Sequence, residues 1–216
     1  MSYSCIISPN STRRQAPYSG LEALLRWQHP KLGLLTPDLF LPLAEKTGQI
    51  IPIGNWVINE ACRQLREWHL KGHQNWSMAV NLSTLQFEQP SLVSTVLDCL
   101  TRHQVPPEML ILEVTETTAM SNPDESVRVL TELTNAGVKA SIDDFGTGYS
   151  SLLYLKRLPA CELKIDRAFV KELSGESKDA TIVSAIVALA KTLNLKVVAE
   201  GGGNRSTASL FDGTGL

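Results

Sequence analysis

Apolar positions along the chain follow two alternating patterns, and each pattern predicts one kind of element. Helical spacing is clear at 55–71, where Val57, Ala61, Leu65 and Trp68 recur every three or four positions, as on one face of an α-helix. Further helices are predicted at 37–45, 91–103, 122–136, 150–158 and 178–193. Short and almost wholly apolar runs predict strands at 76–82, 109–114, 138–143, 161–165 and 195–199.

Strand and helix alternate along most of the chain, and the predicted strands are apolar throughout rather than polar on one face. Such strands are typical of a parallel sheet covered by helices. The two ends lack this alternation, because residues 1–20 are polar and rich in turn formers and three glycines open the segment after Glu200. We therefore expect an α/β domain at 21–201, an atypical N-terminal loop at 1–20 and a flexible tail at 202–216.

Composition excludes several classes of protein. The chain has 216 residues, of which 43% are hydrophobic, enough for one large domain or two small ones. Its 20 basic and 22 acidic residues give a formal charge of −2, which argues against a basic surface for a nucleic-acid polymer. No apolar run approaches the roughly 18 residues of a membrane helix. The four cysteines form no CxxC pair, so we expect no thiolate zinc site and a reduced, cytoplasmic compartment.

Polar residues at the ends of the predicted strands are the most informative feature. They lie at or near the carboxyl end of successive apolar runs, about one strand–helix unit apart. In a (β/α)8 barrel such residues converge on one mouth, where catalysis occurs. Glu22, which interrupts an earlier apolar run at 21–25, could join them. The residues at the strand ends are Asn81, Glu113, Asp143, Asp144, Lys164 and Glu200.

This set of side chains points to divalent cations. Several carboxylates in one mouth cannot all stay ionised without a counter-charge. The candidate ligands are oxygens, without histidine or cysteine, so Mg²⁺ or Mn²⁺ fits better than Zn²⁺. The adjacent Asp143 and Asp144 suggest two ions, which could clamp a phosphoester. Because neighbouring side chains of a strand point to opposite faces, one of these two aspartates should lie beyond the strand end.

Each of these residues also has an ordinary structural interpretation. Glu22 could be a solvated charge, Asn81 a strand-end cap, and Asp143 with Asp144 a plain turn. Lys164 and Glu200 are harder to explain, because a charge in a buried strand is costly without a partner. The shared position of all these residues at strand ends favours a common site.

The segment Glu22-Ala-Leu24, which continues through Arg26, resembles the signature of the EAL domain. That family consists of bacterial cyclic di-GMP phosphodiesterases that fold as a modified TIM barrel. The resemblance covers about residues 21–201 and implies the same fold, incomplete here at both ends. Other motifs of the family occur in order at 42–45, 80–83, 112–116, 143–151, 163–166 and 198–201.

The resemblance implies a role for each matching residue. Lys164, together with Glu22 and Asp144, would be catalytic, and Lys164 would hold or help to activate the hydrolytic water. Arg26 would contact a substrate phosphate, and Leu24 would also touch the substrate. Glu45 would be a supporting acidic residue, and Glu116 would brace the loop at 144–151. The metal ligands would be Glu22, Asn81, Glu113, Asp143, Asp144 and Glu200.

The implied reaction opens cyclic di-GMP to linear pGpG with two Mg²⁺ or Mn²⁺ ions, and the resemblance implies a homodimer as in the intact family. The chain departs from the family at both ends. Tyr18 is not followed by the Gln-Pro of the family's first strand motif, and Gly202 stands where the family continues towards an eighth strand. We therefore expect an atypical first strand, a missing last strand and helix, and low stability. The alternatives to an active enzyme are an inactive cyclic di-GMP-binding or interaction module and a non-functional fragment.

Overall fold

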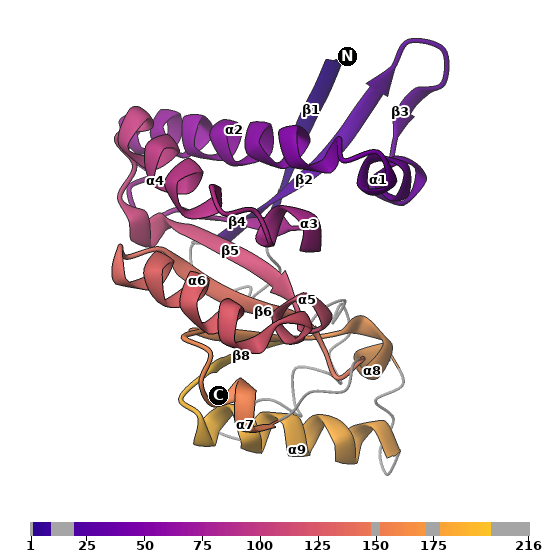
Figure 1. Ribbon diagram of the computed structural model, residues 1–216, viewed down its shortest axis with the longest axis vertical. Helices are drawn as coiled ribbons and strands as arrows, with labels where there is room; N and C mark the ends of the chain where they lie inside the picture. Colours follow the sequence, from indigo (N-terminus) through magenta and orange to yellow (C-terminus); the bar gives the residue numbers. More distant parts are fainter. Residues whose placement is uncertain (1, 10–19, 148–151, 172–177, 200–216) are drawn as a thin grey trace. The chain divides into compact units, whose positions relative to one another are not determined.

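The computed structural model describes residues 2–9, 20–147, 152–171 and 178–199, drawn as ribbons in Figure 1. The chain forms two compact units. Unit 1 comprises Met1–Val114 and Thr131–Lys139, and unit 2 comprises Thr115–Leu130 and Ala140–Leu216. Each unit contains parallel strands accompanied by helices, which confirms the predicted α/β class. Among the helices that the structure describes, none is long and apolar enough to cross a membrane.

The strands of unit 1 form one set of paired strands. Three of them run parallel in the order β2, β4, β5, while β1 and β3 each pair antiparallel with β2. The parallel pairing of β2 with β4 covers only the start of β2, because the end of β2 pairs with β3. The bounds are β1 (Ser2–Pro9), β2 (Gly20–His29), β3 (Gly33–Leu35), β4 (Ser77–Leu82) and β5 (Leu110–Thr115).

The expectation of a loop throughout 1–20 is wrong for Ser2–Pro9, which forms β1. Its residues pair one to one with β2, from Ser2 opposite Gln28 to Pro9 opposite Leu21. Backbone hydrogen bonds to a neighbouring strand stabilise this segment, and such bonds need no alternation of apolar and polar side chains. That is why the pattern of side chains gave no sign of it.

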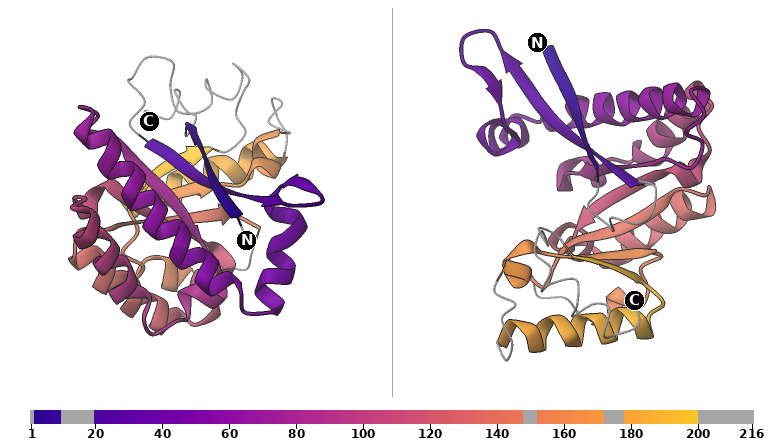
Figure 2. Two further views of the ribbon diagram at one scale, coloured as in Figure 1. Left: turned by 90° about the horizontal axis from the view of Figure 1, so that it is seen from above. Right: turned by 180° about the vertical axis from the view of Figure 1, so that it is seen from behind.

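The helices of unit 1 include two long ones, α2 and α4, which lie side by side (Figure 1 and Figure 2). Helix α2 begins at Ile50 rather than at 55, because Pro52 lies in its first turn, where the missing N–H would have no helical acceptor. Buried side chains from α2, β4 and β5, such as Leu65, Met78 and Leu112, form the core. The bounds are α1 (Pro37–Lys46), α2 (Ile50–Leu70), α3 (Thr84–Phe87), α4 (Leu92–His103) and the 3-10 helix η1 (Pro107–Met109).

Among the described residues of unit 2, three parallel strands pair in the order β6, β7, β8. Helix α9 packs against β8 and α8, and Ile142 and Leu163 are fully buried in the strands. Helix α6 (Pro123–Asn135) starts in unit 2 and ends in unit 1. The other elements are β6 (Lys139–Phe145), β7 (Glu162–Ile165), β8 (Lys196–Ala199), α5 (Glu116–Ser121), α7 (Leu152–Leu155), α8 (Arg167–Lys171) and α9 (Lys178–Thr192).

The predicted helices and strands agree with these elements within a few residues at each end. The helix expected at 150–158 is described only as α7, and residues 150 and 151 lie outside the described residues. The flexible tail expected at 202–216 and Glu200 also lie outside them. The short elements α3, α5, α8 and β3 were not anticipated, since each is too short to display a period.

Candidate functional site

Three candidate ligands share one face of the parallel strands in unit 1. Asn81 and Glu113 are register partners in β4 and β5, so their side chains lie on the same side of the sheet. Glu22 in β2 is the register partner of Ala79, two positions before Asn81, and therefore points to that side as well. The Asn81 Nδ2 donates a hydrogen bond of 2.9 Å to the Glu22 Oε1. The register of the strands thus gathers two carboxylates and one amide.

The chemistry of these donors fits a hard divalent cation. Glu113 is 1% exposed, and burial of an anion is unfavourable unless a positive charge or donors offset it. The amide oxygen of Asn81 is a further oxygen donor of the kind that such a cation prefers. Mg²⁺ is commonly held by only one or two carboxylates, with water and substrate oxygens completing its shell. Over the described ranges, no three histidine, cysteine, aspartate or glutamate side chains form a group that could hold a metal.

Strand β2 places Leu24 and Arg26 on the same face as Glu22, because alternate residues of a strand share a face. Arg26 is half-buried, and its Nη1 donates to the backbone carbonyl of Leu25 at 2.8 Å. Just beyond it, the ring of Trp27 makes edge-on contacts with His29 at 4.8 Å and with Phe40 of α1 at 5.7 Å between centroids. The contact with Phe40 packs the end of β2 against α1, on the face of the strand opposite Glu22, Leu24 and Arg26.

In unit 2 the structure brings Lys164 of β7 to Asp143 of β6. The Lys164 Nζ lies 3.0 Å from the Asp143 Oδ2. Lys164 is 0% exposed and Asp143 is 7% exposed, so the two charges meet away from solvent. A buried pair of this kind is costly to desolvate, and its presence in a strand is expected where the charges have a chemical task.

Asp144 follows Asp143 within β6, so the expectation that one of the two lies beyond the strand end is wrong. The register of β6 against β7 shifts between Ile142 and Phe145, and Asp144 has a φ of 53°. This irregularity breaks the strict alternation of side chains. The backbone N–H of Asp144 donates to the Asp143 Oδ1 at 2.9 Å, and the hydroxyl of Thr147 donates to the Asp144 carbonyl at 2.8 Å.

Glu116 accepts a hydrogen bond at the start of the loop that follows β6. Its Oε2 accepts from the backbone N–H of Gly146 at 2.7 Å, and Glu116 is 2% exposed. Gly146 has a φ of 102°, and a Cβ there would lie 2.9 Å from the ring of Phe169. Both the backbone angle and the ring require glycine at this position.

A row of polar residues, which the sequence pattern did not predict, crosses the strands two positions before Asp143 and Lys164. Glu162 is 8% exposed, and its carboxylate accepts from the Ser141 hydroxyl at 3.4 Å and from the Lys196 Nζ at 2.8 Å. Ser141, Glu162 and Lys196 lie on β6, β7 and β8, in register with one another. A charged residue inside a short apolar strand was the signal that could have revealed this row, because it needs a partner.

Two other predicted residues have no described contact with the rest of the candidate site. Glu45 is exposed on α1, and Glu200 lies outside the described residues.

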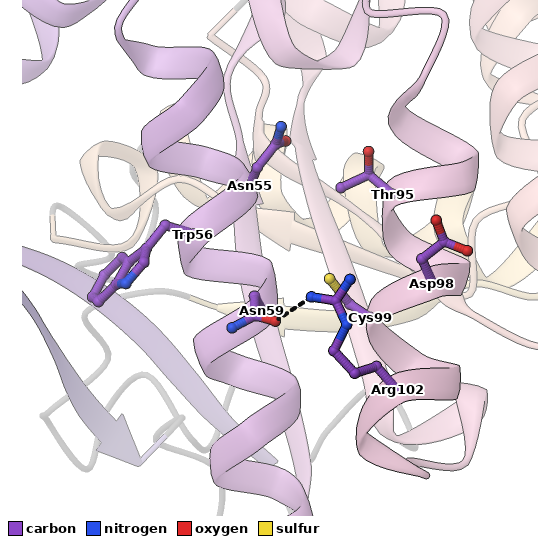
Figure 3. A pocket seen from close by; sticks show the side chains of 7 residues that line it. All are labelled: Asn55, Trp56, Asn59, Thr95, Asp98, Cys99 and Arg102. Atoms are coloured by element: carbon purple, nitrogen blue, oxygen red, sulfur yellow. Dashed lines mark hydrogen bonds between the residues drawn. The ribbon is translucent and has the colours of Figure 1, made fainter.

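Unit 1 also has an open groove between α2 and α4, to which Asn55, Asn59, Thr95, Asp98 and Arg102 contribute (Figure 3). Arg102 Nη1 crosses it to Asn59 Oδ1 at 3.3 Å. None of the predicted site residues that the structure describes lines this groove.

Comparison with known proteins identifies close relatives. The chain matches the EAL domain family over residues 9–215. It is 61% identical over 196 residues to the bifunctional diguanylate cyclase/cyclic di-GMP phosphodiesterase MucR of Pseudomonas aeruginosa, covering 91% of this chain and 28% of that protein. It is 48% identical over 181 residues to the cyclic di-GMP phosphodiesterase NbdA of the same species, covering 84% and 23%. The chain thus spans about a quarter of the length of these curated relatives.

Solved structures give the same result for the fold. The PaMucR phosphodiesterase in complex with c-di-GMP matches with a TM-score of 0.90 at 55% identity, covering 99% of this chain and 87% of that one. The cGMP-bound form of the EAL enzyme Bd1971 matches with a TM-score of 0.90 at 33% identity, covering 99% and 59%. The predicted boundaries at 21–201 stay a prediction.

Proposed function

Since the chain belongs to the EAL domain family, we propose that it hydrolyses cyclic di-GMP to linear pGpG in a metal-dependent reaction. The resemblance found in the sequence is thereby confirmed at the level of the family. The structural observation that carries the proposal is the buried contact between Lys164 and Asp143. A buried ammonium beside a carboxylate is suited to hold a water molecule and to handle its proton next to a phosphodiester.

We propose that the candidate ligands bind two Mg²⁺ or Mn²⁺ ions. The donors are oxygens throughout, which are the ligands that these hard cations prefer. When bound, the ions would offset the charge of the phosphodiester and supply a water of lowered pKa. The proposed ligands are Glu22, Asn81, Glu113, Asp143, Asp144 and Glu200, the last of which lies outside the described residues.

The remaining residues would bind and orient the substrate. Arg26 can present its guanidinium to a phosphate in a bidentate manner, and it shares a face of β2 with Glu22. Leu24 lies between them on that face and would give an apolar contact to the substrate. Glu116 would keep the loop after β6 in place through its bond to Gly146, and Glu45 would add negative charge from α1. The homodimer and the cytoplasmic location stay predictions.

The proposal is tested by incubating the purified chain with cyclic di-GMP and following pGpG by liquid chromatography. Reactions contain Mg²⁺, Mn²⁺ or a chelator, and the Glu22→Ala variant is run in parallel. We expect metal-dependent product from the unmodified chain and none from Glu22→Ala. Glu108→Gln, which alters an exposed glutamate of η1, is the matched control and should retain activity.

A calorimetric titration with cyclic di-GMP separates an inactive binding module from a non-functional fragment. If the folded chain gives no pGpG but binds cyclic di-GMP in calorimetry, it is a binding module and not an enzyme. If it neither hydrolyses nor binds the nucleotide, the chain is a non-functional fragment. Product formation that is unaffected by the chelator would contradict the proposed metal dependence.

A further inference from the structure

Gly54 occupies an unusual place for a glycine, in the interior of the long helix α2. Glycine is less favourable than alanine inside a helix, so the missing side chain needs a reason. The reason is the side chain of Gln86 in α3: a Cβ on residue 54 would overlap the carboxamide carbon and oxygen of Gln86. The absence of a side chain at Gly54 therefore allows the Gln86 carboxamide to lie against the backbone of α2.

Gln86 is equally unusual on its side of this contact. It is 2% exposed, and within the described residues its Nε2 has no hydrogen-bond partner. A buried donor without an acceptor is destabilising, and an apolar side chain of similar size would avoid that cost. Helix propensity thus favours alanine over Gly54, and burial favours an apolar side chain over Gln86. Positions that break such rules are expected where function constrains the structure.

The contact lies close to a candidate metal ligand. Strand β4 carries Asn81 and ends at Leu82, and Ser83 then caps α3 by accepting the N–H of Gln86 on its hydroxyl at 3.3 Å. The N–H of Phe87 donates to the carbonyl of Ser83 at 2.9 Å. Leu82 and Phe87 are buried on either side of the cap. Any movement of α3 along α2 is therefore transmitted within a few bonds to the backbone that carries Asn81.

We propose that Gln86, seated on Gly54, is a positioning residue that fixes Asn81 for the divalent cation. The contact fixes the position of α3 relative to α2, and the position of α3 fixes the backbone at the end of β4. That backbone in turn places the Asn81 amide against Glu22. The inference rests on the proposed function only for the identity of the group that Asn81 faces.

The test measures Mn²⁺ binding to the full chain from the electron paramagnetic resonance signal of free Mn²⁺. Gly54→Ala introduces the overlapping methyl group, and Gln86→Ala removes the carboxamide. We expect Gly54→Ala to weaken Mn²⁺ binding by roughly tenfold or more, the usual size of effect for residues that orient metal ligands. Gln86→Ala should weaken it several-fold. Gln74→Ala, which alters an exposed glutamine in the turn between α2 and β4, is the control and should bind as the unmodified chain does.

The double variant Gly54→Ala/Gln86→Ala makes the test specific to the contact between residues 54 and 86. Once Gln86→Ala has removed the carboxamide, a methyl group at position 54 has nothing to overlap. Gly54→Ala should then leave the Mn²⁺ dissociation constant unchanged, so that the two substitutions are strongly non-additive. Equal weakening by Gly54→Ala in both backgrounds overturns the proposal, as does unchanged binding in a folded Gly54→Ala chain. If Gly54→Ala does not fold, Gln86→Ala decides alone, since it only removes atoms.

A second readout does not depend on metal. In metal-free protein, the side-chain amide resonance of Asn81 in a ¹H–¹⁵N spectrum reports its hydrogen bond to Glu22. We expect this resonance to shift in Gly54→Ala and, to a smaller extent, in Gln86→Ala, and the double variant Gly54→Ala/Gln86→Ala should give the same resonance position as Gln86→Ala alone. If the unmodified chain binds no Mn²⁺, the proposed function fails, while this resonance still decides the positioning role. An Asn81 resonance that does not move in Gly54→Ala overturns the role.

Discussion

At the scale of single residues, Asp144 is the most constrained position of the candidate site. A φ of 53° places it in the left-handed region although it lies within β6. That region is unfavourable for most L-residues but is adopted more readily by aspartate and asparagine. The Thr147 hydroxyl and the Asp143 carboxylate hold the peptide groups on either side of it. The backbone thereby spaces two consecutive carboxylates that a regular strand would point to opposite faces.

The left-handed conformation predicts how substitutions at this position differ in stability. Asp144→Asn should unfold at nearly the same denaturant concentration as the unmodified chain, because asparagine accepts this φ. Asp144→Val should lose about 1–2 kcal/mol, since a β-branched side chain clashes with the backbone there. Urea denaturation followed by circular dichroism measures both. Equal stability of the two variants would show that residue 144 does not keep this conformation in solution.

The buried pair of Lys164 and Asp143 gives a second prediction. Lys164→Met removes the ammonium and leaves the Asp143 carboxylate without its ion-pair partner at 7% exposure. Breaking a buried pair in this way costs about 3–5 kcal/mol, so the urea midpoint should fall steeply. Lys71→Met is the matched control, because Lys71 pairs with Glu67 in solvent at 3.0 Å and should show little change. A Lys164→Met chain as stable as Lys71→Met would contradict the buried placement.

At the scale of elements, length decides what could be predicted from the sequence. The helices α1, α2, α4, α6 and α9 extend over enough turns for their apolar period to appear. The segments α3, α5 and β3 span too few residues for any period, and tertiary partners fix them instead. Helix α5 shows this, because the Thr115 hydroxyl caps its start and Glu116 binds the loop after β6. Strand β1 could not be predicted for a related reason, because backbone pairing with β2 holds it and its side chains show no period.

The bond between α5 and the loop after β6 predicts a local effect. Glu116→Ala leaves the Gly146 N–H without its acceptor, which should cost about 1–3 kcal/mol and speed hydrogen exchange at Gly146. Glu116→Gln keeps an oxygen acceptor and should restore most of the protection. Nuclear magnetic resonance detects exchange at this single amide, and Glu125→Ala on the exposed start of α6 serves as control. Protection of Gly146 that survives Glu116→Ala would rule out this support.

At the scale of the whole molecule, the candidate site was partly predictable from the sequence. Polar residues at strand ends were visible in the sequence, and the structure places Asn81 against Glu22 and Lys164 against Asp143. The distortion at Asp144 and the contact of Gln86 with Gly54 were not visible. Both depend on backbone angles and on the distance between elements remote in the sequence, which single residue identities do not encode.

The buried thiols couple the stability of the molecule to pH. Cys62 of α2 is 0% exposed and Cys99 of α4 is 4% exposed. Burial raises the pKa of Cys62 to about 12, with a smaller contribution from the nearby Cys99 thiol, and burial also raises the pKa of Cys99. In the unfolded chain these thiols return to their ordinary pKa of roughly 8.5. The folded state therefore binds more protons than the unfolded state at alkaline pH.

The stability of the chain falls as the pH rises above about 8. Below about pH 8 both states keep the thiol protons, and the full stability is present. Above that pH the unfolded chain loses protons that the folded chain retains, so the free energy of unfolding falls by up to about 1.4 kcal/mol per pH unit for each thiol. Urea midpoints between pH 7 and pH 10 should show this decline. Cys62→Ala should reduce the slope, whereas Cys161→Ala, which alters an exposed thiol, should not. Parallel slopes in the two variants would mean that Cys62 is not buried in the folded chain.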